Sequence, residues 1–379
     1  VKRNPSGTLK QTLALAKDDD FMKELLEHEL PEVQMVAAAK LSAGSTIAET
    51  RVESFLRWNA LGYLCTPYKV SGAHTYRLSG TQGINVQNLP SERSGSTALR
   101  NSIHPIADDE IMVVADYSQV EVRTGKYIAG DQEGNALLAA GVDPYLLLAS
   151  KMFHISVEEI TALYEAKDEH TVKVKRPFGK AGVLGCGYGV GAKKARLVAK
   201  IMAGLTITES EAADLVSLYR EAEPLTVSVW NRNKDIIDLL INRVEGFKFF
   251  GYTGDLFETI VQRVGRLTIP GILLPDGNVL KYYGIHRRKE ENFERLLAGF
   301  KDVVEYRGNN GMKSIYGAKL FENQNQALAM CIAKHHIVEI ARELKGIAKI
   351  CLNTHDEIGV TCKTLHAHEV AAEIRRIMT

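Results

Sequence analysis

The stretch Asp-Tyr-Ser-Gln-Val-Glu-Val-Arg, residues 116–123, follows a mostly apolar run at 110–115 and begins with a carboxylate. The segment Glu-Ile-Met-Val-Val-Ala-Asp at 110–116 has the composition of a buried β-strand. A second segment, 347–363, predicts a β-hairpin whose turn lies near His355 and Asp356. If these strands are neighbours in one sheet, Asp116 and Asp356 lie close together.

Two converging aspartates suit the transfer of a nucleotidyl group. That reaction needs the attacking oxygen, the phosphorus and the leaving pyrophosphate in line, with the accumulating negative charge neutralised. Two divalent cations roughly 3.5–4 Å apart meet both needs, and they prefer oxygen ligands. An aspartate at a strand end is more often a turn initiator, so the surrounding residues decide what these two do.

Between the two strands lies the pattern Arg176-x-x-x-Lys180-x-x-x-Leu184-x-x-x-Tyr188. Four-residue spacing places these side chains on one helix face roughly 18 Å long, with cations at one end and flatter groups at the other. The helix lies in a block, 171–208, that contains no acidic residue, as suits a polyanion such as a triphosphate. Six glycines between 179 and 191 each cost about 1 kcal/mol in a helix interior, so packing and bound nucleotide are expected to order it.

These segments resemble the motifs of DNA polymerase family A (DNA polymerase I-like). Residues 116–123 are similar to motif A, usually written DYSQIELR, and Thr-His-Asp-Glu at 354–357 is similar to motif C. The helix pattern is similar to motif B, RxxxKxxxFxxxYG. The resemblance runs from about residue 60 to the C-terminus and leans towards phage polymerases. It implies an α+β right-hand fold with an antiparallel-sheet palm, helical fingers and a partial helical thumb.

The resemblance also implies roles for particular residues. Two Mg²⁺ ions, with Mn²⁺ as a substitute, would be held by Asp116, Asp356 and the backbone carbonyl of Tyr117. Arg176 and Lys180 would grip the triphosphate and act in catalysis. The expected nucleotide-binding residues are Arg176, Lys180, Leu184, Tyr188, Gln119, Glu121 and Tyr145. Leu184 departs from the usual Phe or Tyr, and Tyr145 stands where many relatives have a His.

A further resemblance concerns the primer–template duplex. Thr-Tyr-Arg-Leu-Ser at 75–79 and Asn-Val-Gln-Asn-Leu-Pro at 85–90 are similar to the family's TGRLSS…NLQNIP segment. Amide and guanidinium donors can test minor-groove acceptors that all base pairs share. The resemblance therefore predicts that the duplex is contacted by Arg77, Gln87, Asn88, Gln326 and His355. The expected partners are primer–template DNA and deoxynucleoside triphosphates, with a replicative helicase or other replisome proteins as further candidates.

Three alternatives remain open at this point. Gly187-Tyr-Gly189-Val-Gly191-Ala imitates a dinucleotide-binding fingerprint, but no regular strand–helix alternation surrounds it. A single-subunit RNA polymerase would share the aspartates and the Arg/Lys helix. Glu121, five residues after Asp116, favours DNA synthesis because family A DNA polymerases place there a glutamate that blocks a ribose 2′-hydroxyl. A polymerase homologue that binds DNA without catalysis is the third.

The domain layout expected from the sequence is a partial thumb at 1–58, palm at 59–145, fingers at 146–272 and palm again at 273–379. Helices are predicted over 8–58, over roughly 145–265 with interruptions, and over 315–345. The resemblance predicts no 3′-5′ exonuclease segment in this chain. Because the first residue is Val1, the chain is expected to be a fragment or a processed product.

The composition excludes several classes of protein. The chain is 45% hydrophobic and 25% charged with a net charge of +1, which is typical of a soluble globular protein. No window approaches 18 uninterrupted apolar residues, so no membrane span is expected. The sequence and the resemblance together predict a cytoplasmic monomer, in the bacterial host cytoplasm if the protein is phage-encoded.

Overall fold

A computed structural model describes residues 2–3, 9–10, 20–26, 28–43, 47–89, 97–291, 300–309 and 311–379. The chain forms two compact units. The first unit comprises Val1–Pro67 and Gly80–Ile106, and the second comprises Tyr68–Ser79 and Ala107–Thr379. Of the residues predicted to form the site, Gln87 and Asn88 belong to the first unit and the others to the second.

The first unit is mainly helical. Its helices are α1 (Asp20–Leu26), α2 (Pro31–Ala43), α3 (Ile47–Asn59) and α4 (Ala98–Asn101), with a 3₁₀ turn at Val86–Asn88. The helical prediction for 8–58 is confirmed for α1 to α3. It is wrong at β2 (Leu9–Lys10), because this segment pairs antiparallel with β1 (Lys2–Arg3); part of the predicted helix, 11–19, lies outside the described residues.

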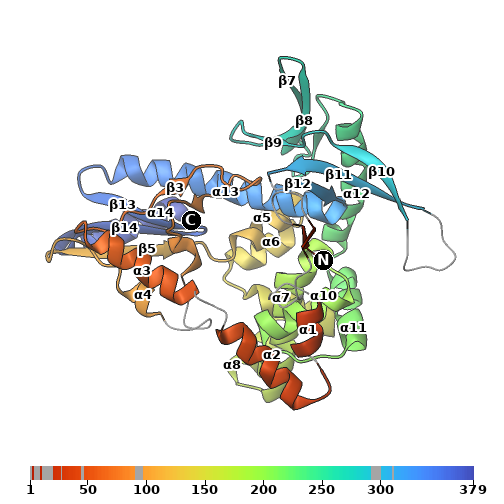
Figure 1. The fold of residues 1–379 in the computed structure, drawn as a ribbon, viewed down its shortest axis with the longest axis horizontal. Helices are drawn as coiled ribbons and strands as arrows, with labels where there is room; N and C mark the ends of the chain where they lie inside the picture. Colours follow the sequence, from red (N-terminus) through yellow and green to blue (C-terminus); the bar gives the residue numbers. More distant parts are fainter. Residues whose placement is uncertain are drawn as a thin grey trace. The chain divides into compact units, whose positions relative to one another are not determined.

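A three-stranded antiparallel sheet carries both predicted aspartates. The strands β13 (Ala348–Thr354), β14 (Glu357–Lys363) and β5 (Glu110–Asp116) lie in the order β13-β14-β5, which confirms the predicted strand and hairpin. The prediction that the strand 110–116 is buried is wrong, because β5 lies at the edge of the sheet and Ile111 and Val114 are 42% and 51% exposed. The long helix α13 (Gly317–Glu343), also predicted, and the C-terminal helix α14 (Ala367–Met378) cover one face (Figure 1). Their buried side chains form one hydrophobic cluster with the strands, including Ile340, Ile358, Val360 and Val370.

Helices fill the middle of the second unit: α5 (Val120–Ala129), α6 (Gln132–Ala139), α7 (Pro144–Phe153), α8 (Val157–Glu165), α9 (Arg176–Gly185), α10 (Ala192–Val198), α11 (Glu209–Ala222) and α12 (Pro224–Ile241). Local chemistry fixes several starts. Asp143 caps α7 and Ser156 caps α8, while Thr208 and Glu211 form a capping box on α11. No described helix is both long and apolar enough to cross a membrane.

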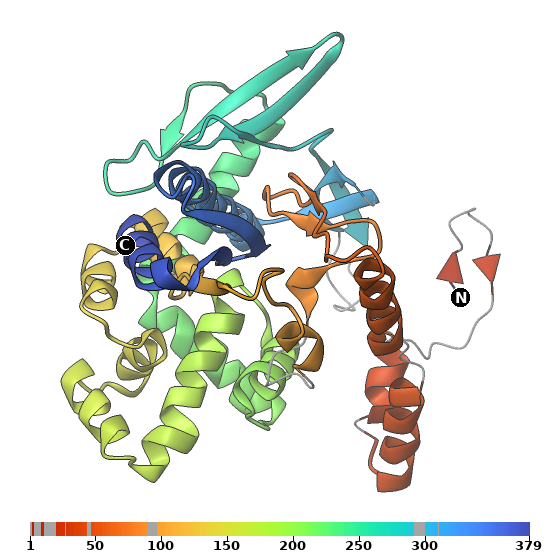
Figure 2. The ribbon, with the colours of Figure 1, turned by 90° about the vertical axis from the view of Figure 1, so that its left-hand side faces the viewer.

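Beyond α12 the predicted helical stretch is wrong, because the chain turns to strands. A four-stranded sheet contains β6 (Lys248–Phe249), β7 (Phe257–Val264), β8 (Leu267–Leu273) and β9 (Val279–Lys281). Along β7 buried and less buried side chains alternate, a period of two that only a strand satisfies. The β7–β8 hairpin, teal at the top of Figure 2, is the longest part of this sheet and extends beyond its two short strands, β6 and β9. A further antiparallel sheet contains β10 (His286–Glu291), β11 (Phe300–Gly308) and β12 (Gly311–Ile315).

Candidate active site

The sheet brings the backbones of the two predicted aspartates together. Asp116 ends β5 and pairs in register with Glu357, the first residue of β14. Asp356 lies in the turn immediately before β14, and its carbonyl accepts a hydrogen bond of 2.9 Å from the backbone N–H of Tyr117. Both aspartates are exposed. Two carboxylates at one sheet edge, open to solvent, form a set of oxygen donors suited to a hard divalent cation.

The residues next to these aspartates are firmly placed. The Tyr117 side chain is buried, and its hydroxyl lies 2.9 Å from Nδ1 of His336 on α13. That a metal ion is held by the Tyr117 backbone carbonyl stays a prediction from the resemblance. The Glu357 backbone lies opposite Asp116 in the sheet, and the Thr354 hydroxyl donates a bond of 2.8 Å to the Glu357 carboxylate. No role was predicted for Glu357 from the sequence.

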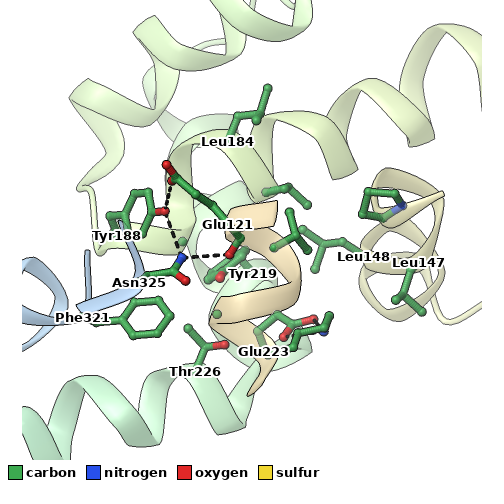
Figure 3. A pocket seen from close by; sticks show the side chains of 16 residues that line it. Glu121, Leu147, Leu148, Leu184, Tyr188, Tyr219, Glu223, Thr226, Phe321 and Asn325 are labelled. Atoms are coloured by element: carbon green, nitrogen blue, oxygen red, sulfur yellow. Dashed lines mark hydrogen bonds and ion pairs between the residues drawn. The ribbon is translucent and has the colours of Figure 1, made fainter. Parts of the chain in front are cut away.

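Glu121 lies at the centre of a hydrogen-bonded network (Figure 3). Its carboxylate forms an ion pair with Arg77 and accepts a bond of 2.6 Å from the Tyr188 hydroxyl. The Asn325 amide donates to the Glu121 carbonyl at 2.8 Å and to the Tyr188 hydroxyl at 3.2 Å. The structure therefore brings together three predicted residues from distant parts of the sequence. Asn325 was missed, although its neighbour Gln326 was predicted.

Burial and the Glu121 carboxylate hold the pKa of Tyr188 well above its ordinary value. The hydroxyl thus stays protonated and donates to Glu121 at neutral pH. Thr124 completes the arrangement, because its hydroxyl donates to the Asn325 side-chain oxygen at 2.6 Å. A network in which each member is satisfied fixes side-chain positions more firmly than its separate bonds would.

The glycines of α9 allow close packing. A β-carbon on Gly179 would lie 2.0 Å from the carbonyl oxygen of Tyr145 on α7, and one on Gly182 would lie 2.6 Å from Leu148. The helix ends at Gly185 and tightens into a 3₁₀ turn at Cys186–Tyr188. Three of the four side chains predicted to share one helix face, those of Arg176, Lys180 and Leu184, thus belong to α9. The fourth, Tyr188, lies on the 3₁₀ turn that follows. These glycines let α9 lie close against α7; that packing and bound nucleotide order the helix stays a prediction.

Arg176 is already engaged at the start of α9. Its Nη2 and Nε atoms lie 2.8 and 3.0 Å from the Asp143 carboxylate. The guanidinium lies 5.1 Å from the ring centroids of both Tyr145 and Tyr164, within cation–π range. Asp143 therefore caps α7 and pairs with Arg176, a double role that the sequence did not indicate.

A cavity of about 150 Å³ lies between α5, α7 and α9 (Figure 3). Its lining includes Leu184, Tyr188 and Glu121. Lys126 and Glu223 also line it, and the Lys126 ammonium lies 2.6 Å from Asp131 and 3.3 Å from Glu223. Burial lowers the pKa of Lys126, but the two carboxylates outweigh it and leave that pKa raised. This buried ion cluster was not predicted, because sequence spacing does not reveal it.

Two predicted residues near the aspartates have left-handed backbones. Gln119 has φ 48° and His355 has φ 63°; both are uncommon for residues other than glycine, and such conformations gather at functional sites. Burial and then Arg77 lower the pKa of His355, so the ring is neutral at neutral pH. The Ser118 hydroxyl donates to the Gln119 side-chain oxygen at 2.8 Å.

The remaining predicted residues fall in two places. Gln326 lies on α13, where its side-chain oxygen accepts a bond of 3.4 Å from Thr75. Gln87 and Asn88 lie in the first unit on the 3₁₀ turn, which Asn85 caps by accepting from the Gln87 N–H at 3.1 Å. Contact of these three residues with a duplex stays a prediction.

Comparisons with known proteins find similar sequences among DNA polymerases. DNA polymerase I of Geobacillus stearothermophilus is 28% identical over 163 residues, which are 43% of this chain and 17% of that protein. The DNA polymerase of Bacillus phage SP02 is 26% identical over 263 residues, 69% of this chain and 37% of that protein. This chain therefore spans less than half the length of these relatives.

A solved structure shares the fold. The POL domain of Pol1 from M. smegmatis, in complex with DNA primer-template and dNTP, superposes with a TM-score of 0.59 at 18% identity. The superposition covers 100% of this chain and 54% of that one. The sequence profile of DNA polymerase family A matches residues 3–234, which is more than half of the chain. The chain therefore belongs to DNA polymerase family A.

Proposed function

We propose that this chain is the catalytic part of a template-directed DNA polymerase, which adds deoxynucleotides to a primer 3′ end by two-metal-ion phosphoryl transfer. The observation that carries the proposal is the shared sheet edge of Asp116 and Asp356, whose backbones are joined by the bond from the Tyr117 N–H to the Asp356 carbonyl. The Pol1 domain of M. smegmatis was solved in complex with DNA primer-template and dNTP. The same substrates are proposed for this chain.

The oxygen donors at this edge fit Mg²⁺. Asp116, Asp356 and the Tyr117 carbonyl would hold the ions, which when bound supply alignment of the 3′ oxygen and neutralisation of phosphate charge. Among the described residues no group of three or more His, Cys, Asp or Glu side chains forms a metal cage. An open site with few protein ligands is usual for Mg²⁺, because substrate phosphates and water complete its coordination.

The residues of α9 would bind the nucleotide. Lys180, one turn after Arg176 on the same face, is suited to the triphosphate. Arg176 would contact the phosphates directly if it left Asp143. If it stays paired with Asp143, it would act indirectly by fixing the position of α9. Glu121, held by Arg77 and Tyr188, would occupy the space of a ribose 2′-hydroxyl and thereby favour deoxynucleotides.

A primer-extension assay with Mg²⁺ tests the proposal. Asp116→Ala and Asp356→Ala should each lower the rate by at least about 100-fold, because each removes a metal ligand. Asp109→Ala is the matched control: this exposed aspartate lies just before the other end of β5 and pairs with Lys363, so its loss should leave extension unchanged. Full activity in either of the first two variants would overturn the assignment.

A further inference from the structure

One tyrosine has the backbone conformation of a glycine. Residues 73–77 form a closed turn, in which the Tyr76 N–H donates to the Ala73 carbonyl at 3.1 Å and the Ala73 N–H to the Arg77 carbonyl at 3.3 Å. Tyr76 has φ 64°, in the left-handed region that a β-carbon makes unfavourable. The similar family segment, TGRLSS, has glycine at this position, where the conformation is free of that cost.

Contacts with two separate elements hold Tyr76 in place. Its hydroxyl donates a bond of 2.5 Å to the Val279 carbonyl on β9. Its ring lies 4.7 Å from the ammonium of Lys334 on α13, and it packs against both hydrophobic clusters of the second unit. Each contact is modest alone, but together they fix the turn to β9 and α13 despite the unfavourable φ.

The turn carries two residues directed at the candidate site. Arg77, next to Tyr76, forms the ion pair with Glu121, and its side chain is 33% exposed. Thr75, on the other side, donates to Gln326 on α13 at 3.4 Å. The conformation at Tyr76 therefore determines where the Arg77 guanidinium lies relative to Glu121.

We propose that Tyr76 is a positioning residue for primer–template binding, which holds Arg77 in its duplex-binding position before the DNA arrives. The proposal rests on the proposed function, in which Arg77 contacts the duplex. A glycine at this position would let the turn sample other conformations, and ordering it on binding would reduce affinity. A tyrosine anchored to β9 and α13 avoids much of that entropic cost.

The test measures the KM for primer–template and kcat in extension, and the Kd for the same duplex by fluorescence anisotropy without nucleotide. Tyr76→Gly should raise KM and Kd by about tenfold with kcat nearly unchanged. Tyr76→Phe keeps the ring on Lys334 but loses the bond to Val279, so the rise should be about two- to threefold. In the Tyr76→Gly background, Arg77→Ala should add little, because Arg77 has already lost its position.

The matched control is Tyr252→Phe, which also deletes a hydrogen-bonded tyrosine hydroxyl, here an acceptor from Asn135 at 2.8 Å. Its KM and Kd should match those of the unmodified chain. A folded Tyr76→Gly variant with unchanged Kd, or full additivity with Arg77→Ala, would overturn the proposal. If the unmodified chain extended no primer, the proposed function would fail, but the anisotropy measurement would still decide the role of Tyr76.

Discussion

At the scale of single residues, Glu121 shows how one side chain serves several contacts. It pairs with Arg77, accepts from Tyr188 and receives the Asn325 amide on its backbone carbonyl. The carboxylate is held by two partners and its backbone by a third, which keeps the side chain from swinging away from a bulkier sugar. The network therefore supports the prediction that Glu121 discriminates against ribonucleotides.

Glu121→Ala should raise the ratio of ribonucleotide to deoxyribonucleotide incorporation by at least about tenfold, because it removes the group that would meet the 2′-hydroxyl. Glu121→Gln is the matched control, since it keeps the size but loses the charge that pairs with Arg77. It should retain most of the discrimination while weakening duplex binding. The measurement is single-nucleotide extension with each sugar in turn; an unchanged ratio in Glu121→Ala would refute the assignment.

Some residues of the candidate site could be predicted from the sequence and others could not. Asp116, Asp356 and Glu121 were predicted because they lie in short strings that resemble family motifs. Asn325 and Asp143 were not, because their importance depends on partners more than 30 residues away, Glu121 and Arg176. Such pairings arise from tertiary packing, which no local pattern records.

At the scale of elements, the strand Glu110–Asp116 and the helix Gly317–Glu343 were predictable because each has a clear composition or a long uninterrupted pattern. The β7 strand, Phe257–Val264, was missed although its buried side chains alternate. It follows soon after a long helical region, and the helical prediction was extended to about residue 265, into this strand. The glycines of α9 were noticed, but their packing role required knowing that α7 lies against them.

Alanine substitutions at Gly179 and Gly187 distinguish the need for close packing at a glycine from the low helix propensity of glycine. A β-carbon at Gly179 would meet the Tyr145 carbonyl at 2.0 Å, whereas one at Gly187 would have its nearest neighbour, the Tyr219 hydroxyl, at 3.5 Å. Gly179→Ala should destabilise the fold by about 1–3 kcal/mol in spite of alanine's better helix propensity. Gly187→Ala, the control, should be neutral or slightly stabilising.

Denaturation by urea, followed by circular dichroism, measures both glycine variants under the same conditions. The informative quantity is the difference between the two midpoints, since both substitutions add one methyl group to the same short segment. Equal midpoints would mean that α7 and α9 do not approach as closely as the structure has them.

At the scale of the whole molecule, apolar cores supply the packing that stabilises the fold. The second unit contains two large hydrophobic clusters, one around α9, α12 and α13 and the other between α13, α14 and the sheet of β5. Asp116 and Asp356 are exposed. We therefore expect that folding of this unit does not need the ions that the proposed reaction requires.

Chelation should thus separate activity from stability. Removing Mg²⁺ with EDTA should lower primer extension by at least about 100-fold, while the melting temperature shifts by less than about 1 °C. The small shift follows from linkage, because an ion present near its Kd stabilises the fold by only about 0.4 kcal/mol. Added Mg²⁺ or Mn²⁺ should restore extension. Extension that survives chelation, or cooperative unfolding on adding EDTA, would contradict an open site built from two aspartates on a metal-independent fold.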